Sequence, residues 1–211
     1  MVPLVTTIPL MILAFDTSSA ACTAALFDGA GACIARADEV IGRGHAERLV
    51  PMLDELLAGR KAEESLVGVG PGSFTGLRVA IAAAHGLAIG WDAKISGMMS
   101  LALIAAGAQQ DGDLAVAVMG GHGELFVCEF GPGGEATNDL RNLVPSEAAA
   151  TTKAKLVVGS GARVLVDARG WGEARDALPS AADALKIAPG LRMLPPKPIY
   201  ARAPDARAKA A

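Results

Sequence analysis

The sequence is poor in several residue types that would point to a particular class of protein. Aromatic residues make up 4% of its 211 positions and charged residues 19%, and histidine and cysteine occur three times each. A hydrophobic content of 52% nevertheless excludes intrinsic disorder, which requires low hydrophobicity and high charge. We therefore expect a folded protein with one large domain or two small lobes.

An excess of positive charge is also lacking. Lysine and arginine together number 19 against 22 aspartate and glutamate residues, which gives a net charge of −3. Proteins that bind nucleic acid alone usually carry a basic surplus, so we expect any RNA contact to be shared with a partner. No apolar run continues without glycine, arginine or histidine for the ~20 residues that a bilayer requires, and we expect no membrane association.

The three cysteines are not spaced as a metal or redox site. Cys22, Cys33 and Cys128 form no Cys-x-x-Cys pair, and Cys22 and Cys128 lie in apolar stretches. These features predict a reducing, cytoplasmic setting without a disulfide framework or a zinc site. Residues 1–10 lack a basic segment and a small-residue cleavage site, and we expect an N-terminal extension there.

Histidines are too far apart to form a metal site by local spacing. His45, His85 and His122 are nearly forty residues apart, and position 49 is leucine, so no His-x-x-x-His pair exists. A Gly-x-Ser-x-Gly turn, which would hold a catalytic serine, is also missing. The sequence therefore predicts neither a catalytic residue nor a bound catalytic metal.

The apolar pattern predicts mixed strands and helices in two lobes. For the first lobe, residues 11–106, we expect strands at 11–16, 21–27, 32–37, 66–70 and 94–96 and helices at 44–58, 75–89 and 100–108. For the second lobe, residues 107–211, which follows a polar cluster at 109–113, we expect strands at 114–119, 125–130 and 156–158 and helices at 145–152 and 180–188. We expect an extended chain after residue 189.

A glycine-rich loop is the strongest local motif. It runs from Gly70 to Gly76 between an expected buried strand and an expected helix, and Ser73 and Thr75 add hydroxyl groups. Glycines such as Gly72 allow the backbone to approach closely, and backbone N–H groups at the start of a helix can bind an anion. Both interpretations remain open: an ordinary helix start with Thr75 near the cap, or a functional loop.

A second candidate lies at the end of the first strand. Asp16, Thr17 and Ser18 place a carboxylate before two hydroxyl groups, which is how actin-like and sugar-kinase-like folds hold a metal-bound phosphate. The following residues lack the glycines of such a hairpin. A turn capped by Asp16 and a phosphate site are therefore both open. Asp16, Thr17, Ser18, Gly72, Ser73, Thr75 and Gly76 form the candidate set for phosphate or nucleotide contact.

These segments together resemble the TsaB (YeaZ) family, in the glycoprotease-like branch of the two-lobed actin/Hsp70/sugar-kinase (ribonuclease H-like) fold. The resemblance is carried by Ile12-Leu13-Ala14-Phe15-Asp16-Thr17-Ser18, His45-Ala46-Glu47-Arg48-Leu49-Val50-Pro51-Met52-Leu53, Gly70-Pro71-Gly72-Ser73-Phe74-Thr75-Gly76-Leu77-Arg78 and Pro198-Ile199-Tyr200-Ala201-Arg202. It is close over residues 11–106 and loose afterwards. The second lobe looks short, and Met119-Gly120-Gly121-His122 departs from the Asp-Ala-Arg that family members often carry.

The resemblance implies a role in forming N6-threonylcarbamoyladenosine in tRNAs that read codons starting with A. It implies a non-catalytic subunit that acts with a TsaD-like catalytic subunit and a TsaE-like ATPase, holds no tightly bound cofactor and meets tRNA only through the complex. ATP would be used by the partner subunits. Two alternatives are a small-molecule kinase of the same fold and a glycoprotease-like metallopeptidase, although a second-lobe catalytic Asp and clustered metal ligands are not evident.

The expected helix at 75–89 is apolar nearly all round, which is typical of a core helix or of one covered by another chain. We predict that it and the helix at 44–58 bind the TsaD-like subunit, or a second copy of this chain in a homodimer. The candidate interface residues are His45, Leu49, Leu53, Arg78, Ala80, Ala83, Ala84 and Leu87.

Overall fold

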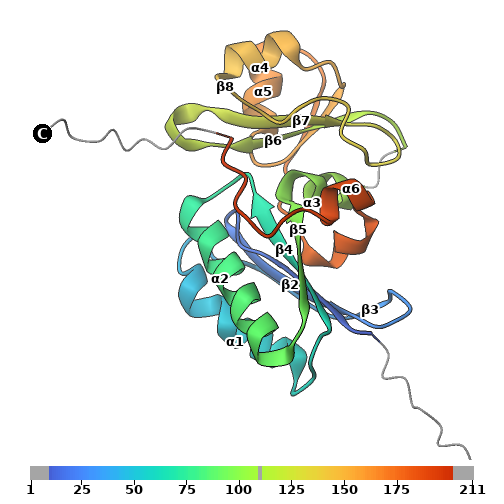
Figure 1. The fold of residues 1–211 in the computed structure, drawn as a ribbon. Coiled ribbons are helices and arrows are strands. Elements are labelled where there is room, and N and C mark those ends of the chain that lie inside the picture. Colours follow the sequence, from blue (N-terminus) through green and yellow to red (C-terminus); the bar gives the residue numbers. More distant parts are fainter. Residues whose placement is uncertain (1–9, 109–110, 202–211) are drawn as a thin grey trace, which may run out of the picture.

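Two five-stranded sheets lie one above the other in the computed structural model, which describes residues 10–108 and 111–201 (Figure 1). Residues 1–9 of the expected extension and 109–110 of the expected lobe boundary lie outside the described residues. The arrangement confirms the predicted two-lobed mixed α/β fold.

The first sheet begins with the predicted three-stranded meander. Its strands are β1 (Ile12–Asp16), β2 (Ala21–Phe27), β3 (Cys33–Val40), β4 (Glu64–Gly70) and β5 (Lys94–Met99), in the order β3-β2-β1-β4-β5. β1, β2 and β3 pair antiparallel, because short turns join them. β4 and β5 run parallel to β1, and each follows a helical connection.

Two helices cover the outer face of this sheet, and their apolar stripes decide which sides face inward (Figure 1). They are α1 (His45–Leu57) and α2 (Phe74–Trp91). Leu49 and Leu53 of α1 pack with Leu13 and Phe15 of β1 in one buried cluster. Period-two alternation sends Ala14 of β1 to the opposite face, where it joins a second cluster.

A middle layer joins the two lobes through a shared core. It contains α3 (Ser100–Gly107) and the 3₁₀ helix η2 (Ala181–Lys186), whose residues share a cluster with both sheets. The expected helix at 180–188 is thus shorter and of a different type. Pro189 disfavours helical geometry at the residue before it and starts α6 (Pro189–Arg192) instead, so the chain after residue 189 is not wholly extended.

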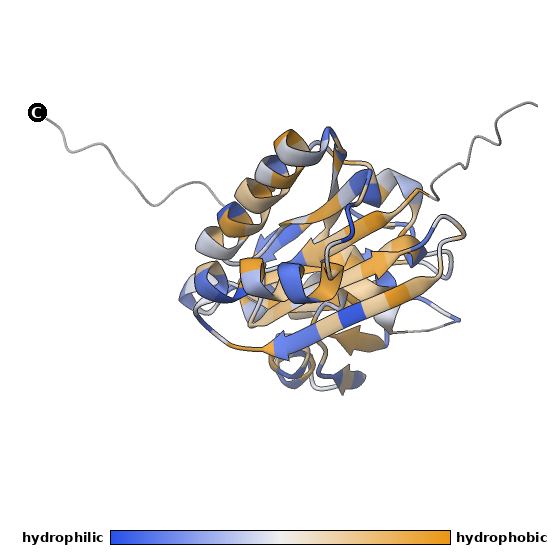
Figure 2. Ribbon diagram, turned by 90° about the horizontal axis from the view of Figure 1, so that it is seen from below, coloured by the Kyte–Doolittle hydropathy of each residue, from blue (hydrophilic) through white to orange (hydrophobic). Residues whose placement is uncertain are grey.

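The second sheet has the order β10-β9-β6-β7-β8. Its strands are β6 (Leu114–Met119), β7 (Leu125–Phe130), β8 (Arg141–Leu143), β9 (Leu156–Val158) and β10 (Glu173–Arg175), and η1 (Gly121–Gly123) joins β6 to β7. The helices α4 (Pro145–Thr151) and α5 (Ala162–Arg169) cover its outer face. Figure 2 shows hydrophobic stretches along the strands and helices that carry both hydrophobic and hydrophilic residues.

The last described residues return to the first lobe. We call residues 194–200 the C-terminal strap. Leu194 exchanges two backbone hydrogen bonds with Gly97 on the edge strand β5, of 2.7 and 2.9 Å, and the Ile199 N–H donates to the Val69 carbonyl at 2.7 Å. A side chain at position 97 would meet the Pro195 carbonyl oxygen, 2.7 Å from its Cβ. The strap therefore protects an otherwise open sheet edge.

Candidate functional site

The two motifs singled out in the sequence meet at the top of the first sheet. Asp16 ends β1, and the glycine-rich loop links β4 to α2. The Ser73 N–H donates to the Ser18 carbonyl at 2.6 Å, and the Thr17 hydroxyl donates to the Gly76 carbonyl at 2.7 Å. The structure thus brings the candidate phosphate-contact residues together, joined directly to one another.

Both carboxylate oxygens of Asp16 already accept hydrogen bonds. Oδ1 accepts from the Ser18 N–H and hydroxyl, each at 2.7 Å, and Oδ2 accepts from the Ser100 hydroxyl at 2.6 Å. Asp16 and Thr17 are 0% exposed and Ser18 is 4% exposed. The carboxylate therefore has no free position facing solvent, and of the two interpretations the structure favours the turn capped by Asp16.

Glycine is required in this loop for close packing. An added Cβ would lie 2.2 Å from the Ser18 carbonyl oxygen at Gly72 and 1.9 Å from the Thr17 carbonyl oxygen at Gly76. Backbone from the β1–β2 turn thus fills the space that an anion would need in front of these residues. Ser73 and Thr75 remain exposed, and Ser73 caps α2 by accepting from the Gly76 N–H.

Five of the eight predicted interface residues lie inside the protein. Leu49, Leu53, Ala80 and Ala84 are at most 3% exposed, so these four side chains pack within this chain, and the interface stays a prediction for the exposed ones. The reason is that the apolar stripe of an amphipathic helix covers its own sheet first. His45 is also buried, with Nε2 3.2 Å from the Ala21 carbonyl oxygen. Ala83 and Leu87 are half-buried, and Arg78 is exposed.

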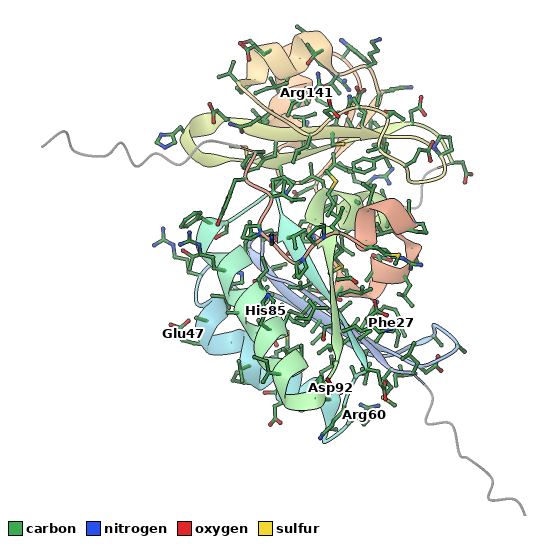
Figure 3. All side chains as sticks on the ribbon, viewed as in Figure 1. Phe27, Glu47, Arg60, His85, Asp92 and Arg141 are labelled. Atoms are coloured by element: carbon green, nitrogen blue, oxygen red, sulfur yellow. The ribbon has the colours of Figure 1, made fainter. Side chains whose placement is uncertain are left out.

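Exposed residues, five of the eight apolar or glycine, lie on the opposite side of the same two helices. We call this surface the outer face. It comprises Ala46, Val50 and Asp54 of α1 and Arg78, Ala82, His85, Gly86 and Ile89 of α2, all exposed. Ile89 is 87% and Val50 62% exposed. Figure 3 labels His85 on α2. By length and composition alone, α2 would also be able to cross a membrane.

Aromatic side chains extend this surface at the start of α2. The Arg78 guanidinium lies 3.6 Å from the centre of the Phe74 ring, and the Tyr200 ring of the strap lies 5.6 Å from Phe74. Phe74 is 50% and Tyr200 47% exposed. Stacked Arg and aromatic residues are typical of the energetic centres of protein interfaces.

Sequence reasoning missed Val50, Ala82 and Ile89. The helical period could have identified them. Val50 directly follows the buried Leu49, and one residue along a helix is a rotation of about 100° away from the buried stripe. Among the described residues no three His, Cys, Asp or Glu side chains come together to hold a metal.

Comparison with known proteins agrees with this geometry. A family model described as TsaD, tRNA N6-adenosine threonylcarbamoyltransferase, matches residues 38–159. The tRNA threonylcarbamoyladenosine biosynthesis protein TsaB of Haemophilus influenzae is 39% identical over 102 residues, 46% of this chain and 42% of that protein. TsaB of Escherichia coli is 34% identical over 128 residues, 56% of this chain and 54% of that protein. The matched segments thus span about half the length of these curated relatives.

A solved structure covers more of the chain. YeaZ from Pseudomonas aeruginosa superposes with a TM-score of 0.77 at 30% identity, over 90% of this chain and 99% of that one. The superposition includes the second lobe, where the resemblance in sequence is loose. On the family model, the curated relatives and this structure together, the chain belongs to the TsaB (YeaZ) family.

Proposed function

We propose that this protein is a non-catalytic subunit of the assembly that forms N6-threonylcarbamoyladenosine in tRNAs reading codons that start with A. It binds a TsaD-like catalytic subunit, and a TsaE-like ATPase joins them. ATP is used through these partners, tRNA is held by the assembly, and the work takes place in the cytoplasm.

The outer face is the observation that carries the proposal. Ile89 and Val50 present branched apolar side chains to solvent on neighbouring helices, and the small exposed residues Ala82 and Gly86 of α2 allow another helix to approach closely. Contiguous exposed apolar surface marks interaction sites in soluble proteins. A stable interface buries about 800 Å² on each partner, which two helices of 13 and 18 residues have the length to supply.

The interior of the first lobe favours a subunit that assists the reaction over one that catalyses it. Asp16 is the acidic residue best placed to hold a metal-bound phosphate, and both its oxygens accept hydrogen bonds from Ser18 and Ser100. A kinase of this fold would need that carboxylate free. In this proposal the partner subunits contribute the reacting groups.

Co-purification with the TsaD-like protein of the same organism tests the proposal. Ile89→Glu places a charge in the outer face and is expected to lower the affinity for that protein by roughly tenfold or more, because a buried carboxylate without a partner is costly. Val40→Glu is the matched control, since Val40 is also apolar and 74% exposed but lies on β3.

Two results would contradict the proposal. One is failure of the wild-type chain to bind the TsaD-like protein at micromolar concentrations. The other is equal affinity of the Ile89→Glu and Val40→Glu variants, which would place the interface elsewhere.

A further inference from the structure

Positive charge is concentrated in the outer layer of the second lobe. Residues 141–175 carry six lysine and arginine residues against three acidic ones, in a chain whose net charge is −3. This segment contains β8, α4, β9, α5 and β10 and lies on the side of the molecule away from α1 and α2 (Figure 1). The proposed function assigns no role to it.

Two lysines from this segment line one hollow. Lys153 and Lys155 are exposed and alternate with buried Thr152, Ala154 and Leu156, so both point outward from the start of β9. The hollow has a volume of about 640 Å³ and is also lined by Thr137, Asn138 and Thr151. Neither lysine has an ion-pair partner among the described residues.

The hollow is also lined by two acidic residues, Glu129 and Asp113. Glu129 is buried, and its Oε1 accepts from the N–H groups of Lys153 and Ala154 at 2.7 and 2.8 Å. Its Oε2 accepts from the Asn138 amide at 2.8 Å. Arg141 Nη2 lies 4.0 Å from the same Oε2, so this carboxylate has a cationic partner other than the two lysines. Asp113 is the remaining acid, and it offers an acceptor for a ribose hydroxyl or a base amine.

An exposed aromatic residue lies next to the lysines. The Arg169 guanidinium donates to the Ala154 and Lys155 carbonyls, both at 2.9 Å, and lies 3.9 Å from the centre of the Trp171 ring. Arg169 therefore holds the indole beside Lys155, while Trp171 stays 48% exposed. Lysines next to a presented aromatic ring are the combination that binds nucleic acid backbones and unstacked bases.

We propose that Lys153, Lys155 and Trp171 form an RNA-binding patch, in which the lysines contact phosphates and the indole stacks on an unpaired base. The inference rests on the proposed function, because the tRNA substrate of that assembly is the RNA that would meet the patch. A patch of two free lysines gives weak affinity alone, in agreement with binding shared among subunits.

The test measures the dissociation constant of a fluorescent tRNA transcript that reads a codon starting with A. The protein is the purified complex of the full chain with its TsaD-like partner, titrated at several salt concentrations. Lys153→Glu/Lys155→Glu and Trp171→Ala are compared with Lys61→Glu/Lys94→Glu, which makes the same charge change at two exposed lysines of the first lobe.

We expect the Lys153→Glu/Lys155→Glu complex to bind tRNA at least roughly tenfold more weakly. The slope of log affinity against log salt should fall by about 0.7–0.9 for each phosphate contact removed. Trp171→Ala should weaken binding roughly fivefold or more with an unchanged slope, because stacking is not ionic. The first-lobe control should stay close to wild type.

Equal tRNA affinity of the patch and control variants overturns the RNA patch. Loss of ATPase-subunit binding with unchanged tRNA affinity also overturns it and makes the surface a protein-docking site. Size-exclusion chromatography before tRNA is added shows whether the wild-type complex forms. If it does not form, the result counts against the proposed function. The tRNA affinities of the isolated wild-type and variant chains are then compared, and equal affinities again overturn the RNA patch.

Discussion

At the scale of single residues, two glycines of the same helix have opposite surroundings. Gly76 lies in the first turn of α2, where an added Cβ would meet the Thr17 carbonyl oxygen 1.9 Å away. Gly86 lies ten residues further on, and an added Cβ there would meet nothing within 4 Å. Helix propensity alone favours alanine at both positions, so packing decides the difference.

Gly76→Ala is therefore expected to lower the free energy of unfolding by about 1–3 kcal/mol, because the joined β1–β2 turn and glycine-rich loop must separate. Gly86→Ala is expected to raise it by up to about 1 kcal/mol. Urea unfolding of the two variants measures both. Equal effects of the two substitutions would mean that the loop does not pack against the turn.

A surface ion cluster predicts a pH dependence. Arg48 donates to both oxygens of Glu39, at 2.6 and 2.7 Å, and to Glu55 at 3.0 and 3.1 Å. These hydrogen bonds lower the pKa of Glu39 and the pKa of Glu55 from their ordinary value of 4.5. Groups with a lowered folded-state pKa stabilise the fold above the unfolded value, and this contribution is lost as the pH falls through the folded value.

Arg48→Met should thus destabilise the protein at neutral pH and have little effect at an acid pH below the lowered folded-state pKa values, where the carboxyls are protonated in both states. Added salt should reduce the neutral-pH difference, because the cluster is exposed. Urea unfolding of wild type and variant at both pH values provides the measurement. A difference that persists undiminished at low pH would assign the effect of Arg48 to packing of its aliphatic stem.

At the scale of elements, two alanines on opposite sides of α2 are only two positions apart in the sequence. Ala84 is 0% exposed and packs in the core beneath the helix, whereas Ala82 is exposed on the outer face. The same substitution at the two positions therefore separates a role in folding from a role in binding.

Ala84→Glu is expected to destabilise the fold by several kcal/mol, on the order of 3–5, because it buries a carboxylate without a partner. Ala82→Glu should change stability by about 0.5 kcal/mol or less and lower the affinity for the TsaD-like protein. Thermal unfolding and co-purification read the two effects independently. A folded Ala84→Glu variant, or an Ala82→Glu variant with full affinity, would contradict the assignment of these faces.

The sequence predicted apolar elements well, including the three-residue β9, and short polar ones poorly. The runs at β1, β2, β6 and β7 are continuous and apolar, and they became strands where expected. β8 and β10 have three residues each, with exposed or half-buried side chains, and carry no periodic signal. α5 was missed because its eight residues include Asp167 and two arginines and bury only Ala162 and Leu165. Such short elements form because neighbouring strands already offer an edge for hydrogen bonding or a face for packing.

Of the candidate site, sequence alone identified the segments but not the orientation of their side chains. The glycine-rich loop and the Asp16 turn do meet, as the phosphate interpretation required, yet Ser100 lies 84 residues from Asp16 and occupies one of its oxygens. Of the predicted interface residues, the structure buries five on α1 and α2 and leaves Arg78 exposed. A hydrophobic pattern shows that one side of a helix is covered. Only the position of the sheet shows which side the protein's own core covers.

At the scale of the whole molecule, the chain has five layers with different tasks. The core around α3 and η2 holds the two sheets together, the outer face of α1 and α2 is available to a protein, and the basic layer around β9 and α5 is available to RNA. The strap carries Tyr200 back to α2, so the far end of the described chain completes the first lobe. Under the proposed function, these two surfaces would contact a partner subunit and RNA on opposite sides of the molecule.

The central claim is that the chain acts in tRNA modification through its outer face. Its most direct test is the amount of N6-threonylcarbamoyladenosine, measured by mass spectrometry of tRNA nucleosides, in cells depleted of the protein and supplied with variants. Depletion should lower the modified nucleoside, wild type and Val40→Glu should restore it, and Ile89→Glu should fail to do so while accumulating as a folded protein. Unchanged modification after depletion, or full restoration by Ile89→Glu, would contradict the account.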